Sequence, residues 1–105
     1  MPVIVELPQS ANATTTVTKL YSRSGTNQTS TYNFTDNYDY GIATMGGYKA
    51  PTFTGTGWTN THSDNSSSNV AYGWIKPNVQ SGEQIKIACS DRYGIAVYGV
   101  KVTVS

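Results

Sequence analysis

Polar and apolar residues alternate along most of the chain, and this pattern predicts β-strands. The clearest stretch is residues 93–104, where every second residue from Tyr98 to Val104 is apolar. Successive side chains of a strand point to opposite faces, so a period of two indicates a strand with one buried face. Further strands are predicted at residues 3–7, 13–22, 29–34, 40–46, 52–58, 70–75 and 84–89.

Turn-forming and polar segments separate these predicted strands. Residues 24–28 predict a loop, and Asp36 and Asp91 each predict a tight turn. Residues 59–69 contain no apolar residue, so we expect a long exposed loop or hairpin tip there. Seven or eight short antiparallel strands at this spacing predict a jelly-roll-like β-sandwich, forming a single domain over residues 1–105.

The tetrapeptide Tyr-Gly-Ile-Ala occurs twice, at residues 40–43 and 93–96. A Ser/Thr-Asp pair precedes each copy closely, and a Gly and then a Lys follow it. We interpret the two copies as related hairpins that give the fold an internal pseudo-symmetry. Equivalent positions should have equivalent surroundings, so Ile42 and Ile95 are both expected to point into the core.

The composition agrees with an all-β fold. The chain has fifteen Thr, nine Val and six Ile, but only two Leu and two Met. β-Branched residues favour strands, whereas the residues that favour helices are scarce. A chain of 105 residues is long enough for one hydrophobic core and too short for two.

Charged residues are few and balanced. They make up 12% of the chain, and the net charge is +1. Without a basic cluster we expect no nucleic-acid partner. The first residues have no basic leader and no long apolar run, so we expect neither a cleavable signal peptide nor membrane insertion. A neutral surface rich in Ser, Thr and Asn suits a protein of a virion or of the extracellular space.

Catalytic chemistry has little support in the sequence. The chain has four Asp, two Glu, one His and one Cys. His62, Ser63 and Asp64 are adjacent on the polar segment and lack the rigid positioning that catalysis requires. Cys89 alternates with Ile85 and is expected to be buried and unreactive. We therefore expect a protein that is not an enzyme and has no cofactor.

A calcium site is left open by the sequence. Asp36, Asn37 and Asp39 supply three oxygen-bearing side chains within four residues. Calcium takes about six to eight oxygen ligands. The pattern does not match the twelve-residue calcium loop, so we favour solvated turn residues and predict no metal site.

Aromatic residues beside the polar segment give the best lead for binding. Tyr and Trp stack on apolar sugar faces or on partner proteins, and Asn, Asp and His add hydrogen bonds. The predicted ligand- or partner-binding residues are Trp58, His62, Asp64, Asn65, Tyr72 and Trp74. The alternative for Trp58 and Trp74 is that they fill the core of a domain short of Leu and Phe.

Replacing Trp58, His62 and Asp64 with Ala is expected to weaken binding and to leave the melting temperature nearly unchanged. If binding persists, the region from Tyr38 to Tyr48 is the next candidate.

Three segments together resemble a known type of module. They are Thr31–Tyr40 (TYNFTDNYDY), Val79–Ile87 (VQSGEQIKI) and Tyr93–Val102 (YGIAVYGVKV). The pattern is similar to small β-sandwich modules of phage and prophage tail proteins, and it implies a structural or host-attachment module of a virion. Such modules associate by symmetry, so the resemblance implies a homo-oligomer, with a trimer favoured. The motifs are structural, and no functional residue of the family is carried over.

Two functions follow as hypotheses. The first is a virion attachment module of the tail-fibre or tail-tip type that binds a glycan or protein on a host surface. The second is a secreted or surface carbohydrate-binding module similar to a lectin.

Overall fold

The computed structural model describes residues 13–104, so the strand predicted at residues 3–7 lies outside the described residues. The described part is all-β and holds no helix that could span a membrane. Its strands are β1 (Ala13–Asn33), β2 (Tyr38–Gly47), β3 (Thr52–Thr54), β4 (Thr59–Asn65), β5 (Val70–Val79) and β6 (Gln84–Val104).

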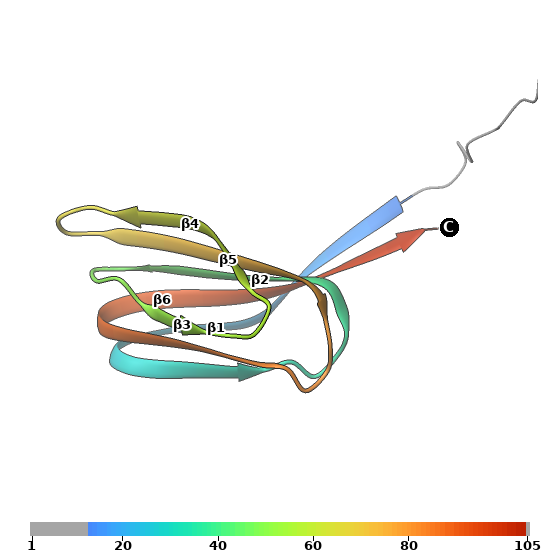
Figure 1. The fold of residues 1–105 in the computed structure, drawn as a ribbon, viewed down its shortest axis with the longest axis horizontal. Coiled ribbons are helices and arrows are strands. Elements are labelled where there is room, and N and C mark those ends of the chain that lie inside the picture. The colour runs from blue at the N-terminus through green and yellow to red at the C-terminus, as the bar shows by residue number, and fades with distance from the viewer. Residues whose placement is uncertain (1–12, 105) are drawn as a thin grey trace, which may run out of the picture.

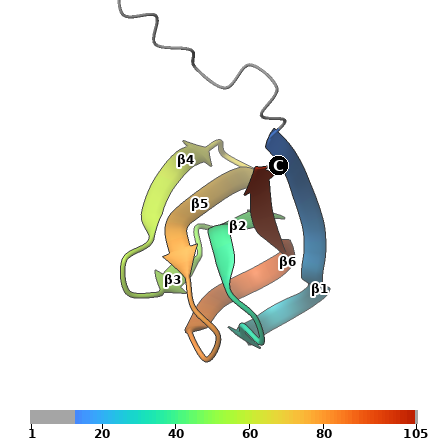
Figure 2. The ribbon, with the colours of Figure 1, turned by 90° about the vertical axis from the view of Figure 1, so that its right-hand side faces the viewer.

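All six strands belong to one antiparallel sheet. The order is β1-β6-β2-β5-β4, and the short strand β3 also pairs with β6. β3 pairs with residues 86–88 of β6, whereas β2 pairs with residues 93–100. The sheet curls so that β3 faces β5 across the interior (Figure 2), where Phe53 stacks on Trp74. The inner side of this curled sheet holds the core.

The sheet has fewer and longer strands than the sequence pattern predicts. β1 joins the two strands predicted at 13–22 and 29–34, and β6 joins those predicted at 84–89 and 93–104. The β1–β6 pairing is irregular at Lys19/Tyr21 and at Thr26/Gln28, and the second irregularity lets the ladder continue where a loop was expected. Asn27 lies at the second irregularity with a φ of 51°. The seven or eight strands and the two-layer sandwich are not confirmed.

The two predicted aspartate turns have different outcomes. Asp36 lies in the connection between β1 and β2, as expected, whereas Asp91 lies inside β6. In both, Oδ1 accepts a hydrogen bond from the next backbone N–H, at 2.7 Å. The side-chain contact is therefore the same, but Asp36 lies in a connection between two strands, whereas Asp91 lies at the bend within β6.

The two Tyr-Gly-Ile-Ala copies lie on neighbouring antiparallel strands, β2 and β6. Met45 is opposite Ile95, and Ile42 is opposite Tyr98. Ile95 is buried, but Ile42 is half-buried and points to the other side of the sheet. The prediction for Ile42 is therefore wrong. A shift of one residue reverses every side chain of a strand, so identical tetrapeptides present opposite faces.

The core combines aliphatic residues with a series of aromatic rings. Its largest fully buried side chains include Phe34, Ile85 and Ile87. Trp58 and Phe53 continue the aromatic contacts from Phe34 towards β5. Cys89 is also buried, as predicted, and burial raises the pKa of its thiol. Its lack of reactivity stays a prediction.

A two-stranded ribbon projects from one end of the sheet (Figure 1). It consists of residues 13–17 of β1 and 100–104 of β6, with Ala13 opposite Val104. Beyond Val100, β6 has no further partner in β2, because the β2–β6 pairing begins at Tyr40 and Val100. The other end of the sheet is formed by the bend at Asn27, the β2–β3 connection and the β4–β5 hairpin tip.

Candidate functional site

Of the two predicted Trp residues, Trp74 belongs to the core and Trp58 packs against it. Trp74 is 6% exposed, and its ring stacks between Phe53 at 4.5 Å and Tyr72 at 5.8 Å, measured between centroids. Trp58 is half-buried, with its ring 6.0 Å from that of Phe34 and 5.6 Å from that of Phe53. These contacts favour the alternative interpretation, in which the two indoles fill the interior.

The polar segment is a strand rather than a long loop. Residues 59–65 form β4 at the edge of the sheet, and only residues 66–69 form the hairpin tip. Asn60 Nδ2 donates hydrogen bonds to the carbonyls of His62 and Gly73, which holds an irregularity in the β4–β5 pairing. Eleven polar residues occur in a row here because an edge strand of this sheet can be exposed on both faces.

The structure brings together one pair of the predicted binding residues on the surface. Tyr72 Oη donates a hydrogen bond of 2.8 Å to Asn65 Oδ1. His62 and Asp64 are exposed on β4. The six predicted residues therefore do not form one site, because Trp58 and Trp74 point into the core while His62 and Asp64 face solvent.

A shallow pocket of about 360 Å³ lies at the end of the sheet away from the ribbon. It is lined by the end of β2, the hairpin tip and the middle of β6, through Gly46, Gly47, Tyr48, Asn69, Val70, Arg92 and Tyr93. We call it the Tyr48 shelf. It combines one exposed aromatic ring, one guanidinium and one side-chain amide above a floor that includes two glycines.

Tyr48 and Arg92 hold each other in place on this shelf. Tyr48 N donates a 3.2 Å hydrogen bond to the Arg92 carbonyl, and the Arg92 guanidinium lies 4.7 Å from the centre of the Tyr48 ring. A cation over an aromatic ring is attracted to the negative face of the ring. The Tyr48 side chain is nevertheless 42% exposed, so part of its ring is free to stack on a ligand.

The two glycines before Tyr48 shape the shelf in different ways. A Cβ on Gly47 would lie 2.6 Å from the Arg92 carbonyl oxygen, so only glycine allows β2 to end this close to β6. A Cβ on Gly46 would meet no atom within 4 Å, so the space above it is open. The sequence signal for this site is a Gly-Gly pair followed by Tyr48, within the Tyr38–Tyr48 region that is the second candidate for binding.

A second cleft of about 300 Å³ opens at the same end of the sheet. Its lining is mostly amide and hydroxyl groups at the bend of β1 and β6, from Asn27, Gln28, Thr29, Ala50, Thr52, Ala88, Cys89 and Ser90. The β2–β3 connection contributes Tyr48 to the first pocket and Ala50 to this one. Polar side chains therefore line a pocket on each side of that connection.

Asp36, Asn37 and Asp39, which the sequence left open as calcium ligands, lie at the opposite end, in a cleft beside the ribbon. Asp36 Oδ2 is 2.6 Å from Lys101 Nζ, and Asp39 Oδ2 accepts a hydrogen bond from Val102 N. The hydrogen bond from Lys101 lowers the pKa of Asp36. Residues 13–104 contain no group of three His, Cys, Asp or Glu side chains placed to hold a metal ion. In this arrangement both carboxylates fasten the ribbon to the body.

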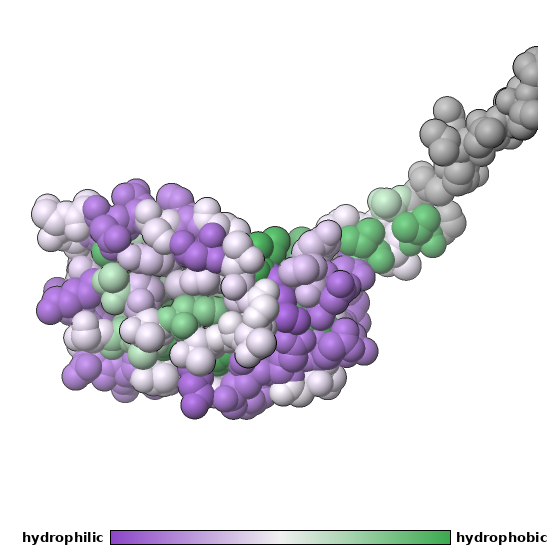
Figure 3. Space-filling view, in the orientation of Figure 1, coloured by the Kyte–Doolittle hydropathy of each residue, from purple (hydrophilic) through white to green (hydrophobic). Residues whose placement is uncertain are grey.

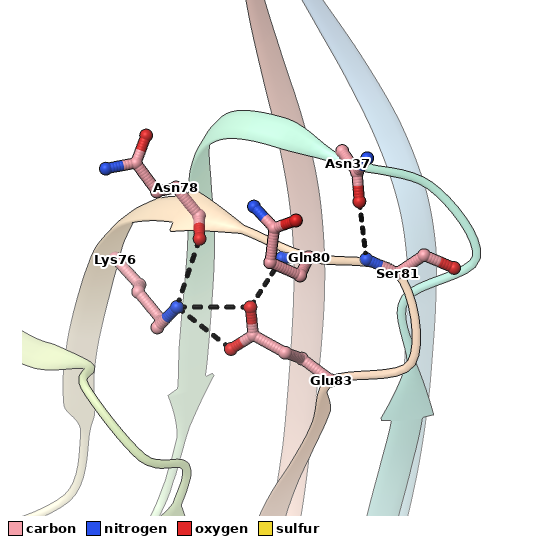
Figure 4. A network of polar contacts seen from close by, with 6 residues as sticks. All are labelled: Asn37, Lys76, Asn78, Gln80, Ser81 and Glu83. Carbon is pink, nitrogen blue, oxygen red and sulfur yellow. Dashed lines mark hydrogen bonds and ion pairs between the residues drawn. The ribbon is translucent and has the colours of Figure 1, made fainter.

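A second ion pair organises the turn between β5 and β6 (Figure 4). Lys76 Nζ lies 2.9 Å from Glu83 Oε1, and Glu83 Oε2 accepts a hydrogen bond from Gln80 N. Ser81 N donates to Asn37 Oδ1 and thereby joins this turn to the β1–β2 connection. Partial burial acts to raise the pKa of Glu83, but the contacts with Gln80 and Lys76 outweigh it and lower the pKa.

Comparison of the chain with models of protein families, with curated proteins and with solved structures gave no match. The resemblance to phage tail modules therefore stays a hypothesis.

Proposed function

We propose that this chain is a non-enzymatic attachment module that binds a neutral glycan of a host surface at the Tyr48 shelf. The observation that carries the proposal is the exposed Tyr48 ring beside Arg92 and Asn69. A sugar ring presents an apolar face that stacks on an aromatic side chain, and its hydroxyl groups bond to amide and guanidinium groups. The shelf supplies both kinds of contact within one pocket.

The position of the shelf supports attachment. The ribbon leaves one end of the sheet, and the shelf lies at the other end, with the hairpin tip beside it. A ligand on the shelf is therefore approached without obstruction from the ribbon. The paired strands β2 and β6 hold Tyr48 and Arg92 at fixed positions, which lowers the entropy lost on binding.

The virion context is part of the same proposal. It rests on the neutral, hydroxyl-rich composition and on the resemblance to phage tail modules.

The proposal also includes a finer description of the fold. We interpret the curled sheet, with β3 facing β5 across the core, as a jelly-roll-like sandwich whose long strands contribute to both layers. The same shelf would serve a secreted carbohydrate-binding module, and neighbouring tail or capsid genes would distinguish the two.

A glycan array followed by binding measurements on three variants tests the proposal. Tyr48→Ala should abolish binding, whereas Tyr48→Phe should retain it because the ring remains. The matched control is the double variant His62→Ala and Asp64→Ala, which removes two exposed side chains of β4 and should bind as the wild type does.

Salt adds a second readout. Binding of a neutral glycan by stacking and hydrogen bonds should change little with ionic strength, because screening acts on interactions between charges. Loss of binding in the β4 double variant together with normal binding by Tyr48→Ala would move the site to β4. A wild-type protein that binds no glycan would overturn the proposal.

A further inference from the structure

Exposed apolar side chains are concentrated on one side of the sheet. Residues 13–104 have five exposed large hydrophobic side chains, and four of them are Val17 (59% exposed), Tyr40 (43%), Val102 (40%) and Val104 (66%). Val17 and Tyr40 are both directly opposite Val100, one on each side of β6. Residues two apart in a strand share a face, so Val102 and Val104 lie on this same side.

The apolar area continues across the sheet beyond these four residues. Ile42 is opposite Tyr98 on β6 and opposite Ile75 on β5, and all three side chains are half-buried on the side away from the core. We call this side, from Val17 on β1 to Ile75 on β5, the outer apolar face. In the row of paired residues that contains Tyr98, Ile42 and Ile75, the one charged residue is Lys19, which lies opposite Tyr98 on β1.

The projecting ribbon carries its valines on this side only, together with Ala13 and Thr15. Its opposite side carries Thr14, Thr16, Lys101 and Thr103. Figure 3 shows hydrophobic residues along the ribbon, next to a body that is largely hydrophilic in this view. An isolated two-stranded ribbon is at best marginally stable in water, and contiguous exposed apolar surface marks sites of protein interaction. The ribbon therefore gains stability when its apolar side is covered.

We propose that a second copy of this chain covers the outer apolar face. The argument for this occupant is charge. The strand register puts no acidic residue on this face and only Lys19 at its border, and the carboxylate beside Val102, that of Asp39, is bonded to the Val102 backbone N–H, so a strongly charged partner would find little counter-charge there. A second copy brings a matching apolar face and almost no net charge, since the whole chain carries +1. Two such faces pack against each other as the inner faces of two sheets do. This inference is independent of the glycan site, which lies at the other end.

The test compares two pairs of substitutions in the full chain by sedimentation velocity across micromolar concentrations. The wild type should self-associate. Val17→Glu with Val102→Glu should weaken association by about tenfold or more, because carboxylates would enter a desolvated apolar contact. The matched control, Thr16→Glu with Thr103→Glu, places the same charges on the other side of the same ribbon and should associate like the wild type. If the Glu pair does not fold, Val17→Thr with Val102→Thr replaces it. This pair keeps the branched side-chain shape and should also weaken association.

Two results would overturn the inference. The first is a wild-type chain that stays monomeric at every concentration. The second is an equal loss of association in both pairs of Glu variants. If the wild type is monomeric and a Val3→Glu, Val5→Glu variant associates, the occupant is instead the chain's own first residues.

Discussion

The hydroxyl groups of Ser30 and Tyr93 lie 3.0 Å apart inside the curled sheet, 63 residues apart in sequence. Ser30 is opposite Ile87 in the pairing of β1 with β6, whereas Tyr93 is opposite Gly25. The hydrogen bond therefore crosses the inner side of the bend at Asn27. Both residues are almost fully buried, and no buried side-chain N or O atom of the described residues lacks a partner.

This pair gives a prediction about stability. Ser30→Ala or Tyr93→Phe alone should each cost about 1–3 kcal/mol, because one buried hydroxyl then lacks its partner. The double variant should lose less than the sum of the two single losses, because no hydroxyl is left unpaired. Chemical denaturation of the four proteins measures the coupling, and strictly additive losses would contradict the contact.

Two glycines of β6 provide a matched comparison. A Cβ on Gly99 would collide with the Tyr38 ring, whereas a Cβ on Gly94 would meet no atom within 4 Å. Gly99→Ala should destabilise the protein by about 1–3 kcal/mol through overpacking. Gly94→Ala should be neutral or stabilise by up to about 1 kcal/mol, because glycine weakens a strand. Thermal unfolding compares the two, and equal melting temperatures would show that the Tyr38 ring does not occupy this position.

The two ion pairs should differ in their effect on stability. Lys76 and Glu83 are mostly buried, with side chains 16% and 27% exposed, whereas Lys101 and Asp36 are about half exposed. Glu83→Gln should cost about 1 kcal/mol at neutral pH, because it leaves the Lys76 ammonium partly buried without its counter-charge. Asp36→Asn should change stability little, since exposed ion pairs contribute little. Urea unfolding of both variants at pH 7 makes the comparison.

The pH dependence of Glu83→Gln follows from the same contacts. The pKa of Glu83 is lower in the folded protein than its usual value of 4.5. Its contribution is therefore present above pH 4.5 and is lost as the pH falls through the lower folded pKa. The cost of Glu83→Gln should accordingly be largest at neutral pH and shrink in acid. An equal cost at both ends of the range would contradict this assignment.

Trp58 should matter for stability rather than for binding alone. Its ring contacts Phe34 and Phe53, and a Cβ on Gly41 would lie 2.7 Å from it. Trp58→Ala should cost about 3–5 kcal/mol, because it leaves a cavity in the core. His62→Ala should lie within about 0.5 kcal/mol of the wild type, as exposed substitutions usually do. This replaces the expectation that a triple substitution including Trp58 would spare the melting temperature, and calorimetry of the two single variants decides it.

The sequence by itself determined the all-β class, because the period-two alternation and the β-branched residues act locally. It also indicated the burial of Cys89, which alternates with Ile85 and Ile87, and of Ile95, which alternates with Tyr93 and Val97. The four-residue tip of the β4–β5 hairpin lies within the segment predicted to be exposed.

Tertiary structure alone decided how strands join and which face each residue takes. The segment around Asn27 has the composition of a loop, but the β1–β6 ladder continues across it because β6 bends alongside. Ile42 and Ile95 share a local sequence and differ in face, because the pairing of β2 with β6 aligns Met45, not Ile42, with Ile95. Tyr48 and Arg92 are 44 positions apart, and only that same pairing brings them together. Register is a relationship between two strands, so no single segment of the chain contains it.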